Sequence, residues 1–389
     1  MLNRQFGAYY LEAVLDAVQE AFEAALVKWR FVGIPQQPEA WLLTVARRKL
    51  LNQLRKDKRM ISTPSEELSI EETDDPDFSE SYVRDSQLDL LLACIQLPLS
   101  KRDRIITTLH VLCGYSPAEL ARAMDVHFEA VRKSLYRNKQ KLAADPVWQK
   151  RPIDGGEEFK YPSTLLEVLY AMFNEGYKSS KSDHNYDIAL CYEAVRLLKL
   201  IIEKHHSVEC HALLALFYFH LSRFPARLDG EGDWMTLQHQ DRSLWDQRLI
   251  GAGFYHLERA KPEDQLNTWY LEAVIASLHV MSPSFDQTPW KEIEQLYLKW
   301  LTYSGSNVMV QLQALTTAIF YRPDAHLAEE LEALRPSMGQ NQQYLVDATL
   351  AELYDKLGNA TKSKQYLSDA IGLCENPRDK RLMEKRMKL

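Results

Sequence analysis

The sequence predicts an all-α protein. Apolar residues recur at three- and four-residue spacing along most of the 389 residues, which is typical of amphipathic helices. Alternating strand patterns are scarce, and only 14 residues are glycine, which disfavours an architecture of strands and tight turns. Two polar, proline-bearing stretches interrupt the helical pattern. They divide the chain into an expected helical domain at 1–60, an acidic linker at 61–85, a second helical domain at 86–147 and a larger helical domain at 148–389.

The overall composition is that of a soluble globular protein, with 46% hydrophobic and 26% charged residues. No run of 18 apolar residues occurs, so we expect no membrane span, and the N-terminus has no signal-peptide pattern. The five cysteines form no CxxC pair and are odd in number, which favours buried thiols in a reducing compartment. We therefore expect a cytoplasmic protein that has no disulfide framework.

Charge is distributed unevenly along the chain. Residues 1–60 hold ten basic and six acidic side chains, a net +4; residues 61–90 hold one and ten, a net −9. Residues 91–150 hold ten and five, a net +5, and since the whole chain carries −7, residues 151–389 carry −7 as well. Two basic blocks on either side of an acidic stretch indicate a nucleic-acid partner for the first 150 residues.

Two helices are predicted in the N-terminal domain. The first spans residues 16–29, and its core-facing side chains are expected to be Val18, Phe22, Ala25 and Leu26. The second spans residues 40–59 and contains seven basic residues against one acidic residue. A basic helix that also carries an aromatic side chain, here Trp41, suits contact with phosphates and unstacked bases. The alternative is that Trp41 belongs to the core and the basic side chains form a solvated face.

A helix-turn-helix is predicted at residues 116–142. Ser116 suits the N-cap and Pro117 the first helical position, and Asp125 falls where the chain must turn before a second helix near Phe128. Val131 and Leu135 are expected to face inward, whereas the outward side chains are Arg132, Lys133, Tyr136, Arg137 and Lys139. A basic second helix of this kind suits a DNA major groove, although a plain helical hairpin with a solvated basic face fits the same pattern.

These segments together resemble extracytoplasmic-function sigma factors. The resemblance rests on Asp16-x-x-Gln19-Glu20-x-Phe22, on Ala40-Trp41-Leu42-x-x-Val45-Ala46-Arg47, and on Leu97-Pro98-Leu99-Ser100 before the helix-turn-helix. It implies a chain that binds core RNA polymerase and directs it to promoter DNA. The first helix of the N-terminal domain looks shortened, and Leu15 stands where an acidic residue is common in that family.

The resemblance also assigns roles to individual residues. The residues implied to dock on the clamp helices of the largest polymerase subunit are Asp16, Gln19, Glu20 and Phe22. The residues implied to open and read the −10 element are Trp41, Arg47, Arg48, Lys49, Arg55, Lys56 and Arg59, and those implied to read the −35 element are Arg132, Lys133, Tyr136 and Arg137. The acidic linker is then a flexible solvated segment, a nucleic-acid mimic that threads the polymerase, or an autoinhibitory partner of the basic helix.

Three segments of the last domain resemble the subgroup of these factors that carries a C-terminal extension similar to tetratricopeptide repeats. They are Phe173–Tyr177, Ser222–Asp229 and Gln240–Trp245. Residues 348–371 also predict a helical hairpin of that kind, with Gly358 at the turn and an inner face formed by Leu350, Ala351, Tyr354, Leu367 and Ala370. Asp347 and Ser363 depart from the repeat pattern, since an aromatic residue and an alanine are usual there.

The same domain contains a dense charge cluster that predicts an interaction or regulatory site. Its members are Arg223, Arg227, Asp229, Asp241, Arg242 and Trp245. In a helical-repeat domain such residues form either an interfacial ion-pair network or the lining of a groove that binds a protein or small-molecule partner. Both interpretations stay open at this point.

No enzyme, metal or cofactor is predicted. Phosphate-loop, nucleophile-elbow and zinc-protease motifs do not occur, and His205, His206 and His211 lack a recognisable ligand spacing. The favoured hypothesis is an alternative sigma factor regulated by its C-terminal domain, which activates or inhibits it. The alternative is a helical-repeat scaffold whose sigma-like half is a relic.

Overall fold

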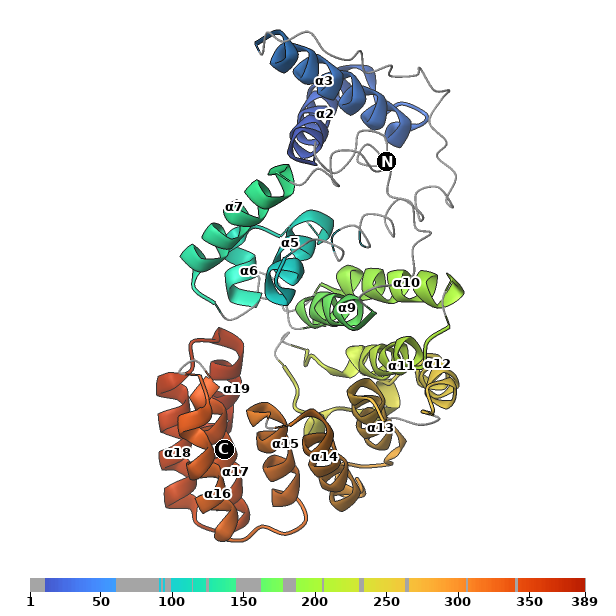
Figure 1. Ribbon diagram of the computed structural model, residues 1–389. Helices are drawn as coiled ribbons and strands as arrows, with labels where there is room; N and C mark the ends of the chain where they lie inside the picture. The colour runs from blue at the N-terminus through green and yellow to red at the C-terminus, as the bar shows by residue number, and fades with distance from the viewer. Residues whose placement is uncertain are drawn as a thin grey trace. The chain divides into compact units, whose positions relative to one another are not determined.

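The computed structural model is all-α, as the sequence predicts (Figure 1). It describes residues 11–60, 91, 94, 99–113, 115–123, 126–144, 162–177, 187–204, 206–230, 234–262, 266–305, 307–339 and 342–388. Over these ranges the only extended pairing is an isolated bridge between Leu228 and Trp234. None of the helices in these ranges combines the length and the apolar character that crossing a membrane requires.

The chain divides into two units, Met1–Leu190 and Cys191–Leu389. Unit 1 contains α2 (Leu11–Val32), α3 (Pro38–Met60), α5 (Lys101–Cys113), α6 (Pro117–Ala123), α7 (Phe128–Ala144) and α9 (Pro162–Tyr177). Helix α10 (Ile188–Lys204) starts at the boundary between the units. The acidic linker at 61–85 lies outside the described residues, and the domain boundaries expected from the sequence stay predictions.

Helices α2 and α3 form a hairpin around a core of small side chains. Val14, Ala17 and Ala21 of α2 pack with Ala46 and Leu50 of α3. Gly33, with a φ of 83°, ends α2, and its N–H donates to the Trp29 carbonyl at 3.0 Å. A glycine adopts this left-handed conformation without the penalty that a Cβ atom brings, and the helix therefore stops at Val32.

The prediction of which α2 side chains face the core is partly wrong. Ala25 is buried, but Phe22 is 53% and Leu26 is 76% exposed. The buried stripe instead runs through alanines at positions 17, 21 and 25. Residues four apart lie on one face of a helix, and small side chains along that face let α3 approach closely. The larger apolar side chains consequently lie beside the contact rather than within it.

Two helices lie where the sequence predicts those of a helix-turn-helix, and the motif itself stays a prediction. Helix α6 begins at Pro117, as the capping pattern indicates, and α7 begins at Phe128, the position predicted for the second helix. The Ser116 N–H donates to the Glu119 carboxylate at 2.7 Å, and the Glu119 N–H donates to the Ser116 hydroxyl at 3.3 Å. These two hydrogen bonds form a capping box, which satisfies otherwise unpaired N–H groups at the helix start. Leu120 of α6 and Val131 of α7 are buried, whereas the predicted turn residue Asp125 lies outside the described residues.

Unit 2 is a succession of helices in which chain neighbours pack on one another (Figure 1). After α10 come α11 (Val208–Ser222), α12 (Gln247–Arg259), α13 (Thr268–Met281), α14 (Trp290–Ser304), α15 (Val308–Ile319), α16 (His326–Leu334), α17 (Gln343–Lys356), α18 (Ala360–Leu373) and α19 (Pro377–Lys388). Helix α11 is the central element, since most of its side chains are buried, including Leu213, Leu214 and Phe217.

A single glycine sets the spacing between α11 and α12. A Cβ atom placed on Gly253 of α12 would lie 2.5 Å from an edge carbon of the Phe219 ring. Phe219 is 1% exposed and packs edge-on against Phe254, so its ring has no free space to move into. Close packing at this point therefore requires the absence of a side chain at position 253.

The hairpin predicted at 348–371 is formed by α17 and α18. Gly358, with a φ of 72°, lies at the turn, and Leu350, Ala351, Leu367 and Ala370 are buried as expected. The two departures from the repeat pattern have local partners. Ser363 is buried and donates to the Ala351 carbonyl at 2.8 Å, while the buried carboxylate of Asp347 forms an ion pair with Arg335.

Candidate functional site

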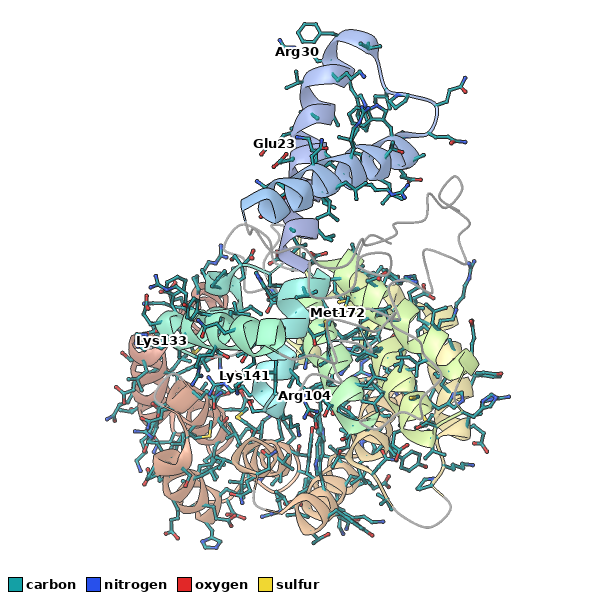
Figure 2. All side chains as sticks on the ribbon, turned by 45° about the horizontal axis from the view of Figure 1, so that its top comes forward. Glu23, Arg30, Arg104, Lys133, Lys141 and Met172 are labelled. Atoms are coloured by element: carbon teal, nitrogen blue, oxygen red, sulfur yellow. The ribbon has the colours of Figure 1, made fainter. Side chains whose placement is uncertain are left out.

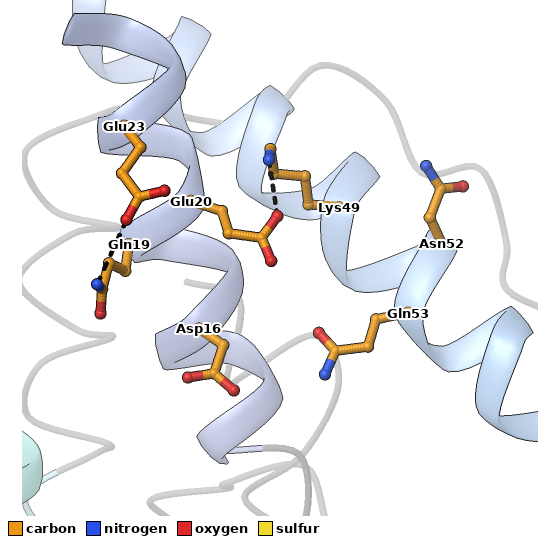
Figure 3. A pocket seen from close by; sticks show the side chains of 7 residues that line it. All are labelled: Asp16, Gln19, Glu20, Glu23, Lys49, Asn52 and Gln53. Atoms are coloured by element: carbon orange, nitrogen blue, oxygen red, sulfur yellow. Dashed lines mark hydrogen bonds and ion pairs between the residues drawn. The ribbon is translucent and has the colours of Figure 1, made fainter.

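Four of the side chains on the exposed face of α2 line a hollow beside α3. Asp16, Gln19, Glu20 and Glu23 follow one another along about two turns of α2, at the spacing that places them on one side of the helix. The opposite wall is formed by Lys49, Asn52 and Gln53 of α3 (Figure 3). Three of the four residues implied by the resemblance to contact polymerase thus meet in one polar hollow. The fourth, Phe22, lies exposed on the same helix.

One ion pair joins the two walls of this hollow. The Lys49 ammonium lies 2.7 Å from the Glu20 carboxylate, with the two side chains 36% and 51% exposed (Figure 3). Gln19 donates to Glu23 at 3.5 Å on the same helix. A surface ion pair of this kind contributes about 0–1 kcal/mol. A residue implied to bind DNA is therefore in direct contact with one implied to bind polymerase.

The sequence left open whether Trp41 belongs to the core or is accessible for DNA contact, and the structure shows a half-buried side chain. Its side chain is half-buried near the start of α3, and its ring centroid lies 5.4 Å from that of Trp29. The Lys28 ammonium lies 5.7 Å from the Trp41 centroid, within the range of a cation–π interaction. Trp41 thus packs on the α2–α3 hairpin while part of its ring stays accessible.

The basic residues of α3 differ in exposure. Arg48 is exposed, whereas Arg47 and Lys49 are half-buried, and the Arg47 Nε has no hydrogen-bond partner. Arg55, Lys56 and Arg59 belong to the last turns of α3, but their side chains lie outside the described residues. Among the implied −10 contacts whose side chains are described, Arg48 is thus exposed to solvent.

Helix α7 presents a continuous basic surface. Arg132, Lys133, Tyr136 and Arg137 are all exposed, and Tyr136 is 62% exposed. Lys133 and the further basic residue Lys141 lie on this helix in Figure 2. Arg132 is 3.6 Å from Glu129, an exposed pair one turn apart that leaves the guanidinium accessible. All four residues implied to read the −35 element thus face solvent.

A polar network that the sequence did not predict connects the inward side of α7 to α5. The inward side of α7 carries Ser134 and Asn138, while Leu135 is only half-buried. Ser134 donates to the Asp103 carboxylate, and Asn138 donates to the Thr107 hydroxyl of α5 at 3.1 Å. One sequence pattern is consistent with this network. The polar residues Asp103 and Thr107 are four positions apart on α5, and Ser134 and Asn138 are four positions apart on α7, so each pair lies on one face of its helix.

The Asp103 carboxylate is held in its charged form by this network. Burial on its own would raise the pKa of Asp103. Hydrogen bonds from Ser134, Ser100 and Asn138, together with the positive charge of Arg137, outweigh burial and lower that pKa. An ionised Asp103 on α5 therefore fixes the orientation of α7 and, with it, the direction of the basic surface.

The charge cluster of unit 2 is built mainly on aromatic and backbone contacts. The Arg227 guanidinium lies 3.8 Å from the centroid of the Trp234 ring, and Arg242 lies 4.6 Å from that of Trp245. The two carboxylates of the cluster, those of Asp229 and Asp241, interact with residues outside the cluster. Asp229 pairs with Lys385 of α19 at 3.2 Å, and Asp241 accepts from the N–H and hydroxyl of Ser243. Arg223, the sixth member, lies 5.9 Å from the centroid of Trp245.

Two family models each match a part of the chain, and one relative matches most of its length. A family model described as sigma-70 region 2 matches residues 4–60, which include α2 and α3. A model described as a family of unknown function (DUF6596) matches residues 162–261. An uncharacterized protein of Rhizobium meliloti (strain 1021) is 29% identical over 373 residues, which cover 94% of this chain and 87% of that protein. No solved structure matches the chain.

The match at the N-terminus covers the α2–α3 hairpin and gives the class of protein that this part of the chain resembles. Sigma-70 region 2 supports a sigma-factor-like role in transcription initiation, which is the role that the sequence motifs of α2 and α3 implied. Its family implies binding to core RNA polymerase and to promoter DNA. The narrower resemblance, to the extracytoplasmic-function type with a repeat-like extension, stays a prediction.

Proposed function

We propose that the chain is an alternative sigma factor of the extracytoplasmic-function type. It binds core RNA polymerase, recognises the −10 and −35 promoter elements and starts transcription in the cytoplasm, while the polymerase itself carries out catalysis. The observation that carries this proposal is the coincidence of the sigma-70 region 2 match with the α2–α3 hairpin. The acidic side chains of that hollow and the basic residues of α3 provide surfaces for the two partners, and these surfaces adjoin at Glu20 and Lys49.

The second domain supports the same proposal through its surface. Four exposed side chains of α7 combine three positive charges with one aromatic ring, on a helix that is hydrogen-bonded to α5 through Ser134 and Asn138. Arginine and lysine contacts to phosphate supply most of the affinity of such helices, and a few side chains near base edges supply the specificity. Residues 91–150 carry a net +5, consistent with this role.

The helical C-terminal domain has the proposed role of regulating the sigma half. Its chain of packed helices leaves a long surface, as repeat proteins do, and its charge cluster occupies an irregular segment between α11 and α12. A protein or small molecule bound there would alter the activity of the attached sigma half. The sign of that regulation is an outcome of the experiment below.

Reconstituted transcription tests the proposal. Core polymerase is combined with the full chain on genomic DNA of the source organism, and new transcript starts are mapped. The expected result is a discrete set of starts that core polymerase alone does not produce. A double change, Arg132→Glu with Arg137→Glu, should abolish these starts, because reversed charges repel phosphate. The control change Arg248→Glu, on an exposed residue of α12, should leave them unchanged.

The alternative, a helical-repeat scaffold with a relic sigma half, predicts no discrete starts from the full chain. A chain ending at residue 150, checked for helical content by circular dichroism, separates the two cases. Starts that appear only after truncation identify the C-terminal domain as an inhibitor. Their absence from both forms would reject the sigma role.

A further inference from the structure

An arginine–tryptophan cluster in unit 2 has the features of a ligand site. We define it as Arg223, Gln240, Arg242, Trp245 and His279. These residues come from the C-terminal end of α11, the irregular segment that follows it, and the last turns of α13. Trp245 is 4% exposed, and the guanidinium carbons of Arg242 and Arg223 lie 4.6 Å and 5.9 Å from its ring centroid.

Both guanidinium groups are held in place by uncharged partners. Arg242 donates through Nη1 to the carbonyls of His279 at 2.8 Å and Ser282 at 2.6 Å, which end α13. Arg223 donates through Nε to the Gln240 side-chain oxygen at 3.4 Å, and Gln240 is itself 8% exposed. Two cations are thus fixed around one ring by amide and carbonyl groups.

Among the described residues, no acidic side chain balances the positive charge of the cluster. Within the described ranges, no carboxylate lies at ion-pair distance from Arg223 or Arg242. The neighbouring acids are used as helix caps, since Asp241 accepts from the Ser243 N–H and Asp246 from the N–H groups of Arg248 and Leu249. Burial and the charge of Arg223 lower the pKa of Arg242, the direction expected for a cation near a second cation.

Three polar atoms of the cluster are buried without a hydrogen-bond partner. They are Nη2 of Arg242, Nε1 of Trp245 and Nδ1 of His279. Buried polar atoms in folded proteins nearly always form hydrogen bonds, so several buried polar atoms without a partner in one cluster call for an explanation. A bound anion would accept from the free guanidinium nitrogens of both arginines and offset their mutual repulsion.

We propose that this cluster binds the phosphate group of a small phosphorylated molecule. Two guanidinium forks match the oxygen geometry of phosphate, and two positive charges match a dianion. In the part of the chain that the structure describes, Arg223 uses only Nε, so both of its terminal nitrogens are available to the ligand, while the buried Nη2 of Arg242 has no partner there. The site lies wholly within unit 2 and concerns a small-molecule input, so its existence does not depend on the sigma role proposed above.

Isothermal titration calorimetry of the full chain with inorganic phosphate tests the proposal. At fixed pH and ionic strength, the wild type should show saturable binding at one site, while sodium acetate should bind more weakly. Arg223→Gln removes one fork and should lower the phosphate affinity by about tenfold or more, because hydrogen bonds between charged groups are stronger than those between neutral groups. Arg248→Gln, an exposed arginine of α12 outside the cluster, should bind as the wild type does.

Two outcomes would overturn the proposal: no saturable heat with the wild type, or equal affinity in the wild type and Arg223→Gln. Circular dichroism verifies that each variant keeps its helical signal. If Arg223→Gln does not fold, Arg223→Lys serves for the same comparison, because it keeps the charge but loses the fork. That variant should also bind phosphate more weakly, and unchanged affinity would count against the site.

Discussion

Lys49 of α3 and Glu20 of α2 form an ion pair at 2.7 Å across the hollow that the two helices enclose. The pair connects the acidic face implied to meet polymerase with the basic helix implied to meet promoter DNA. Its two side chains are 36% and 51% exposed, so solvent screens their attraction. The ion pair is thus better suited to orienting the two surfaces than to stabilising the hairpin.

The first prediction concerns this pair. Glu20→Gln and Lys49→Gln, alone and combined, should change the free energy of unfolding with a coupling of less than about 1 kcal/mol. The coupling should shrink further at high salt, since exposed charges are screened. Urea unfolding of the four proteins measures it. A coupling well above this value that persists in salt would show that the pair is a structural element of the hairpin.

The second prediction concerns the contact between α11 and α12. Gly253→Ala should destabilise the protein by about 1–3 kcal/mol, because the added methyl group meets the buried ring of Phe219. Gly251, two residues earlier on the same helix, has nothing within 4 Å of an added Cβ atom. Gly251→Ala should therefore stabilise by about 0.5–1 kcal/mol through helix propensity alone. Thermal unfolding distinguishes the two, and equal effects at both positions would contradict the packing argument.

The third prediction concerns the polar network between α5 and α7. Asn138 is 1% exposed and donates to Thr107 and Ser134, so Asn138→Ala removes two hydrogen bonds from a buried network. The expected loss is about 1–3 kcal/mol in the free energy of unfolding. Gln140→Ala, two residues along on the exposed side, should change it by less than about 0.5 kcal/mol. Denaturant titration gives both values, and a neutral Asn138→Ala would show that the network does not hold α7.

The fourth prediction concerns the histidine pair between α11 and α12. The Nδ1 atoms of His211 and His256 lie 2.8 Å apart, an arrangement that requires at least one neutral ring. Burial, followed by the charges of His211, Arg259 and Lys199, lowers the pKa of His256 to about 4. The unfolded chain, with a pKa near 6.5, therefore binds a proton that the folded chain does not between these values.

Stability contributed by this pair is accordingly complete above the unfolded pKa and falls as the pH drops toward about 4. The midpoint of urea unfolding, measured between neutral and mildly acidic pH, should decrease less steeply for His256→Gln than for the wild type. His326→Gln, at a residue whose side chain is 74% exposed, serves as the control and should keep the wild-type slope. Identical slopes in all three proteins would refute the assignment.

Sequence patterns predicted the elements that local chemistry determines. The start of α6 follows from Ser116 and Pro117, and the turn between α17 and α18 follows from Gly358. These features need only neighbouring residues, so they can be read without knowledge of the tertiary fold. The match to sigma-70 region 2 likewise falls where the motifs of α2 and α3 had indicated it.

Features that depend on a partner helix were not predictable in the same way. An alanine stripe, rather than Phe22 and Leu26, faces α3, because the fit between two helices decides which side is buried. Ser134 is inward because Asp103 lies opposite, and this pairing involves residues 31 positions apart. The cation–π contacts around Trp245 also involve α13, which no local pattern in 223–245 reveals.

The central claim is that the α2 face docks the chain on polymerase, and a direct binding measurement tests it. Purified core RNA polymerase is titrated with the full chain, with Asp16→Arg plus Glu20→Arg, and with the control Asp355→Arg plus Glu375→Arg, which reverses two exposed acids of unit 2. Tight binding by the wild type and the control, lost in the first variant, is the predicted result. Equal binding by all three proteins would place the docking surface elsewhere, and no binding by the wild type would contradict the sigma role.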